Sequence, residues 1–151
     1  MKNLTAAVWI LLLTLSAVTG FSQNRKSVTP SLFDGYPAII NCTEAQLSSL
    51  FIATKGQNIN LALPGNFMIA GPVASNLVKY SNLQTVNIKL ASFDNTLFSL
   101  SRQTDKNKFK TYAGRILNPL YADGFELKRN AEGNYQLIKI DVQKIVVNCN
   151  Q

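Results

Sequence analysis

The stretch that decides the fold is Val86-Asn87-Ile88-Lys89-Leu90, in which apolar and polar residues alternate one by one. Successive side chains of a β-strand point to opposite faces, so this alternation predicts a strand with one buried face and one solvated face. The same period returns at Phe98 and Leu100, within a second strand that we expect over 96–102. These two neighbouring strands indicate a sheet with a one-sided core.

Similar runs lie on both sides of this centre, and Gly, Pro, Asn and Asp turn signals separate them. We expect further strands at 38–40, 58–63, 66–70, 109–117, 125–128, 135–140 and 145–147. Pro64-Gly65 predicts a hairpin turn, and Gly71-Pro72 predicts another break. The following segment, 73–80, fits a short helix that begins at Pro72, or a loop.

One helix is expected in the mature chain, after Thr43. Thr43 can cap its first turn, and Gln46, three residues on, can complete a capping box. Leu47, Leu50 and Phe51 follow at helical spacing. Because strands otherwise follow strands through short links, the sequence predicts a mainly β fold with one short N-terminal helix. The architecture is expected to be an antiparallel β-sandwich or a partly open barrel, with an α+β fold as the alternative.

The N-terminus resembles a secretory signal peptide over residues 1–22. Lys2 precedes an apolar run, Leu4–Val18, and small residues follow it. The alternative is a retained anchor helix, but this run is shorter than the roughly 20 residues that a spanning helix needs. We therefore expect a secreted or periplasmic protein with no stable membrane span after cleavage. Residues 23–36 are expected to form an exposed, extended lead-in segment, and 37–151 a single β-rich domain.

The composition excludes several kinds of chemistry. The chain has no histidine, which removes Ser-His-Asp triads, Cys-His dyads and His-ligated metals. It also has no phosphate-binding loop or dinucleotide fingerprint. We expect no metal and no cofactor.

The net charge of +7 favours acidic partners, such as an anionic glycan, lipid head groups or an envelope surface, while export argues against nucleic acid. The alternative is that the excess lysine only keeps the protein soluble. A basic run gathers at one expected hairpin tip and consists of Arg102, Lys106, Lys108 and Lys110. This run can meet an anionic surface, or it can be an ordinary solvated tip whose lysines protect a sheet edge.

The two cysteines, Cys42 and Cys149, are expected to form one disulfide, because an exported domain meets an oxidising compartment. Such a bridge would tie the start of the domain to its end. The alternative is a pair of buried thiols.

The densest polar and aromatic stretch runs from residue 112 to residue 125. Its candidate ligand-binding residues are Tyr112, Arg115, Tyr121 and Asp123, because Tyr and Arg often anchor interfaces and stack on planar groups. The alternative places the aromatic side chains in the core and the aspartate in a turn. Asp123 and Glu126 also form a conceivable glycosidase pair, although their closeness in sequence does not show the required separation.

The sequence therefore predicts an exported, non-enzymatic β-rich domain that binds a partner protein or a glycan, or acts structurally at the cell envelope. The alternative is a small secreted hydrolase that uses carboxylate or Tyr/Arg chemistry without histidine. Neither the ligand nor the oligomeric state follows from the residues.

Overall fold

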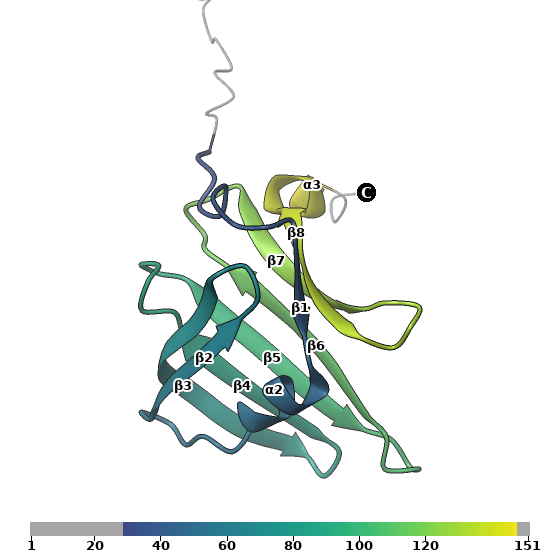
Figure 1. Ribbon diagram of the computed structural model, residues 1–151. Coiled ribbons are helices and arrows are strands. Elements are labelled where there is room, and N and C mark those ends of the chain that lie inside the picture. The colour runs from purple at the N-terminus through teal and green to yellow at the C-terminus, as the bar shows by residue number, and fades with distance from the viewer. Residues whose placement is uncertain (1–28, 148–151) are drawn as a thin grey trace, which may run out of the picture.

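The computed structural model describes residues 29–147, which form one curled antiparallel sheet with two short helices (Figure 1). The elements are β1 (Ile39–Cys42), α2 (Glu44–Ser49), β2 (Asn58–Leu63), β3 (Phe67–Tyr80), β4 (Leu83–Lys89), β5 (Leu97–Thr104), β6 (Lys110–Leu117), β7 (Asp123–Arg129), β8 (Tyr135–Asp141) and α3 (Val142–Val147). The strand order is β1-β8-β7-β6-β5-β4-β3-β2, so the chain from β2 to β8 is a simple meander.

The first strand of the chain, β1, lies at one edge of the sheet, beside the last strand, β8. Ile39 of β1 pairs with Ile138 of β8, whereas β1 and β2 approach each other at the two sheet edges without a ladder between them in the described residues. The predicted mainly β, antiparallel fold is confirmed. Of the two architectures expected, the structure is the partly open barrel, because a single sheet curls around one core.

The alternation read from the sequence sets the two faces of this sheet. Val86, Ile88 and Leu90 are buried inside the curl, whereas Asn87 and Lys89 lie on the convex face. Asn87 there accepts a hydrogen bond from Ser99 at 2.6 Å across the ladder. The expected strand is therefore confirmed, including the direction of its side chains.

Helix α2 fills the concave side, and it begins as the sequence predicts. Thr43 is the N-cap, and its hydroxyl accepts from the backbone N–H of Gln46 at 3.1 Å while the Gln46 side chain accepts from the backbone N–H of Thr43 at 2.9 Å. The buried Leu47, with Leu50 and Phe51 just beyond the helix, then fills the interior of the curl.

The expected break at Gly71-Pro72 is wrong, and so is the expectation of a helix or loop over 73–80. Strand β3 continues through both positions for 14 residues. Its first half pairs with β2 and its second half with β4, so the glycine lies where the strand passes from one neighbour to the other. Gly71 has φ 143°, and Pro72 lies at the last register position of the β2–β3 ladder, just before the pairing with β4 begins at Val73.

The expected final strand over 145–147 is also wrong, because these residues belong to helix α3. The β-branched run suggested a strand. The local start signal is stronger: Asp141 Oδ1 accepts from the backbone N–H of Gln143 at 3.0 Å, as an N-cap aspartate does.

The lead-in segment is not merely exposed chain, because it closes one end of the barrel. Phe33 is fully buried and packs edge-to-face against Phe125 and Phe93, with ring centroids 5.1 and 5.2 Å apart. Lys139 donates from Nζ to the backbone oxygens of Phe33 and Tyr36 at 2.6 and 3.0 Å. A single phenylalanine in a polar stretch carries no periodic signal, so its burial was missed.

Neither of the two helices in residues 29–147 has the length and apolar character needed to cross a bilayer. The predicted signal peptide at 1–22 lies outside the described residues, as does the beginning of the lead-in segment.

Candidate functional site

The four candidate ligand residues do not come together. Tyr112 and Asp123 point into the barrel, Arg115 lies on the convex face, and Tyr121 is in the turn between β6 and β7. The reason is the two-residue period of a strand, which sends Tyr112 and Arg115 of β6 to opposite faces. The stretch 112–125 is therefore not one site.

Asp123 has a structural task within its own chain. Its carboxylate accepts hydrogen bonds from the Ser31 hydroxyl and from the backbone N–H groups of Leu32 at 2.7 Å and Phe33 at 2.9 Å. Burial alone would raise the pKa of Asp123, but these donors outweigh it and hold the pKa below the usual value. The carboxylate fixes the lead-in segment across the end of the barrel.

Asp123 and Glu126 cannot act as a glycosidase pair, because they lie on opposite faces of β7. Glu126 is on the convex face, where Arg115 donates to it at 2.7 Å and Lys128 lies at 3.0 Å. Hydrogen bonds from these two cations lower the pKa of Glu126. The two carboxylates therefore have separate partners and separate surroundings.

Tyr112 is part of the interior. Its ring packs edge-to-face on Tyr135 at 5.4 Å and against Phe51 at 6.0 Å. Its hydroxyl is buried and has no hydrogen-bond partner within residues 29–147. The core interpretation offered for the aromatic residues therefore describes Tyr112.

Cys42 lies at the end of β1 and is buried. As a thiol it has its pKa raised to about 11 by burial, so at neutral pH it would be protonated and a weak nucleophile. Its predicted partner, Cys149, lies outside the described residues, and the disulfide stays a prediction.

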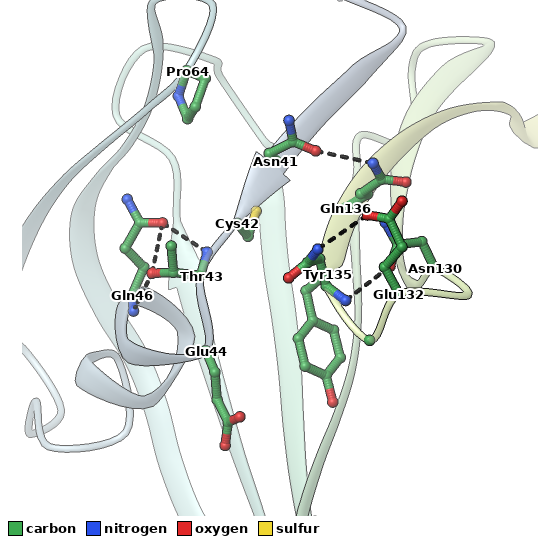
Figure 2. A pocket seen from close by; sticks show the side chains of 12 residues that line it. Asn41, Cys42, Thr43, Glu44, Gln46, Pro64, Asn130, Glu132, Tyr135 and Gln136 are labelled. Atoms are coloured by element: carbon green, nitrogen blue, oxygen red, sulfur yellow. Dashed lines mark hydrogen bonds between the residues drawn. The ribbon is translucent and has the colours of Figure 1, made fainter.

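A cavity opens beside Cys42 (Figure 2). It has a volume of about 650 Å³ and lies where the end of β1, the start of α2 and the β7–β8 hairpin meet. Five carboxamide side chains line it, and the set is Asn41, Gln46, Asn130, Asn134 and Gln136. We call this cavity the amide pocket.

Internal hydrogen bonds fix part of the amide pocket. Gln136 donates from Nε2 to Asn41 Oδ1 at 2.9 Å, which joins β8 to β1, and Asn130 Oδ1 accepts the backbone N–H of Asn134 at 2.8 Å, which shapes the hairpin loop. Within residues 29–147, Asn41 Nδ2 and Gln136 Oε1 have no partner of their own. A donor and an acceptor on neighbouring strands are thus available to a ligand.

The charges that line the amide pocket are unfavourable for anionic ligands. Glu44 and Glu132 line it, and no Lys or Arg does. Carboxylates accept hydrogen bonds and repel anions, whereas carboxamides both donate and accept. The one aromatic residue in the lining, Tyr135, is only 3% exposed and gives no open ring face for stacking. The lining therefore offers hydrogen-bond donors and acceptors and is unfavourable for an anionic ligand.

No sequence pattern predicted this pocket. Its residues come from chain segments about 90 positions apart, and they meet only because β1 pairs with β8. The capping box at Thr43 was the one local signal there, and it marked a helix start rather than a binding site.

Three of the four residues of the predicted basic patch are exposed together, and the fourth is not. Lys106, Lys108 and Lys110 are exposed at the β5–β6 hairpin, but Arg102 turns inward, and its guanidinium lies 4.7 Å from the centre of the Phe51 ring. Arg102 thus covers the core at the end of the barrel where the lysines stand.

The fold and the pocket define a class, a small partly open antiparallel barrel filled by its own N-terminal segments. No family model, no curated protein and no solved structure matches the chain. Among residues 29–147, no three Cys, Asp or Glu side chains gather closely enough to hold a metal ion.

Proposed function

We propose that this chain is an exported, non-enzymatic binding domain of the cell envelope that holds a neutral glycan segment in the amide pocket. The observation that carries the proposal is the lining of the pocket: five carboxamides and two carboxylates, with no cation. Vicinal sugar hydroxyls need neighbouring donors and acceptors, and carboxamides supply both.

The positions of the side chains with shifted pKa values support binding rather than catalysis. The described groups with shifted pKa values are Cys42, Asp123 and Glu126, and they lie in three different places. Asp123 and Glu126 are each held by partners of the same chain, and burial would keep a Cys42 thiol protonated. A hydrolytic site would bring two such groups together in one cavity.

The test is binding of the full chain to an array of neutral and anionic glycans, followed by titration calorimetry on the best neutral one. The double variant Asn41→Ala/Gln136→Ala removes the free donor and the free acceptor. Losing two hydrogen bonds should weaken the affinity about 30-fold. Gln103→Ala is the matched control, because it removes an exposed carboxamide of β5 outside the pocket.

Failure of every neutral glycan to bind would refute the proposal, and so would an equal loss in the control variant. Because the Asn41–Gln136 bond joins two strands, the thermal midpoint of each variant is measured alongside. A preference for anionic glycans would show that the binding surface is not the amide pocket.

A further inference from the structure

One end of the barrel brings three separate chain segments together. Asn76 of β3 donates from Nδ2 to the backbone oxygens of Phe51 at 2.9 Å and Ala53 at 2.8 Å, which holds the segment after α2 against the end of β3. The backbone N–H of Thr104 donates to Asn82 O at 2.8 Å, which joins the end of β5 to the β3–β4 turn. We call segments 51–55, 76–84 and 102–110 together the basic end (Figure 1).

The basic end carries most of the large apolar side chains that the described chain exposes. Eight such side chains are exposed, and five of them belong to these segments: Ile52, Leu77, Val78, Tyr80 and Phe109. Phe109, at the tip of the β5–β6 hairpin, is 69% exposed. Single exposed apolar residues are ordinary, but five at one end of a small domain mark an interaction surface.

Charge at the basic end is almost entirely positive. The cations are Lys55, Lys79, Arg102, Lys106, Lys108 and Lys110, and the single carboxylate is Asp105. Asp105 is engaged in shaping the hairpin tip, where its Oδ1 accepts the backbone N–H groups of Asn107 and Phe109, both at 2.8 Å. None of the six cations forms an ion pair within residues 29–147.

We propose that the basic end docks onto an anionic lipid bilayer, with Phe109 and Tyr80 entering the headgroup region and the lysines contacting lipid phosphates. Ile52 and Phe109 lie in loops, and Leu77, Val78 and Tyr80 lie in the last part of β3. The exposed apolar side chains are thus spread over separate segments, an arrangement that a soft lipid interface can accept. Aromatic rings favour the membrane–water interface, and each lysine near an anionic surface adds to the attraction. This surface does not include the amide pocket, so the inference is independent of the proposed function.

Vesicle sedimentation tests the inference on the full chain. Vesicles of equal parts phosphatidylglycerol and phosphatidylcholine are compared with pure phosphatidylcholine, at low salt and at about 0.5 M NaCl, where charges are screened within a few ångströms. The apolar run Leu4–Val18 would bind both lipids alike, so the readout is the difference between them. We expect binding that needs phosphatidylglycerol and falls with salt.

Two kinds of variant separate charge from insertion. Lys106→Gln/Lys110→Gln should weaken binding to the anionic vesicles about 30-fold. Its control, Lys89→Gln/Lys144→Gln, removes the same charge away from the basic end and should bind nearly as the parent does. Phe109→Ser leaves the charge unchanged and should weaken vesicle binding about tenfold.

Three results would overturn the inference: equal binding to both vesicle types, an equal loss in the control, or unchanged vesicle binding by Phe109→Ser. Dextran sulfate is the soluble comparison. If it competes fully and Phe109→Ser has no effect on either probe, the surface recognises a soluble polyanion and not a bilayer.

Discussion

The carboxylate of Asp123 accepts the backbone N–H of Phe33 at 2.9 Å, although the two residues are 90 positions apart. This bond fixes the segment that places the Phe33 ring at the centre of the aromatic cluster, within 6.4 Å of Tyr36, Phe67, Phe93 and Phe125. The end of the barrel is thus closed by the buried hydrogen bonds of Asp123, which we call the Asp123 clip, and by the aromatic cluster around Phe33.

Replacing Asp123 should therefore destabilise the fold. In Asp123→Ala the N–H groups of Leu32 and Phe33 lose a charged acceptor, at a cost of about 3 kcal/mol in the free energy of unfolding. The measurement is urea denaturation. Asp34→Ala, an exposed carboxylate on the same segment, is the control and should change the free energy by less than about 0.5 kcal/mol. Equal stability of the two variants would contradict the assigned role.

The hydrogen bonds of the Asp123 carboxylate also make the free energy of unfolding depend on pH. Because the folded pKa of Asp123 is below its usual value, its contribution is fully present above the unfolded pKa of about 4 and is lost as the pH falls below it. The difference in unfolding free energy between the parent and Asp123→Asn should be constant from neutral pH to about pH 5 and then shrink. A difference that persists unchanged down to about pH 2 would show that the carboxylate charge is irrelevant.

Two tyrosines with similar surroundings should respond in opposite ways to loss of the hydroxyl. Tyr112→Phe removes a buried hydroxyl that has no partner in the described chain, so it should be neutral or stabilising. Tyr135→Phe removes the acceptor for the backbone N–H of Tyr112, a bond of 3.1 Å, and should cost about 1–2 kcal/mol. Thermal unfolding of both variants checks this prediction. A larger loss of stability in Tyr112→Phe than in Tyr135→Phe would contradict the hydrogen bonding assigned to the two hydroxyls.

Strand β3 should tolerate only glycine at position 71. A Cβ there would lie 2.0 Å from the backbone oxygen of Lys89, and the φ of 143° is unfavourable for other residues. Gly71→Ala should therefore cost more than about 3 kcal/mol or prevent folding. Gly35→Ala, where a Cβ meets nothing within 4 Å, is the matched control for expression level and urea midpoint. Normal folding of Gly71→Ala would contradict the close approach of the Lys89 backbone oxygen to position 71.

The sequence predicted what short-range patterns control. The alternation around Ile88 and the capping box at Thr43 each depend on neighbours a few residues away, and both are confirmed. The features that could not be predicted depend on contacts between residues far apart in the sequence. Asp123 holds the backbone of Phe33, Pro72 lies where β3 passes from β2 to β4, and the amide pocket exists because β1 lies on β8. None of these pairings leaves a trace in local periodicity.

The pairing of Ile39 with Ile138 also sets an order of events in folding. Strands β2 to β8 can add one after another as the chain emerges, each to the strand before it, but β1 has no ladder partner until the last strand has formed. Closing a loop of this length is slow compared with forming hairpins. The N-terminal strand should therefore be the last part of the sheet to gain protection from hydrogen exchange, and a chain truncated before Tyr135 should leave that strand open to proteases.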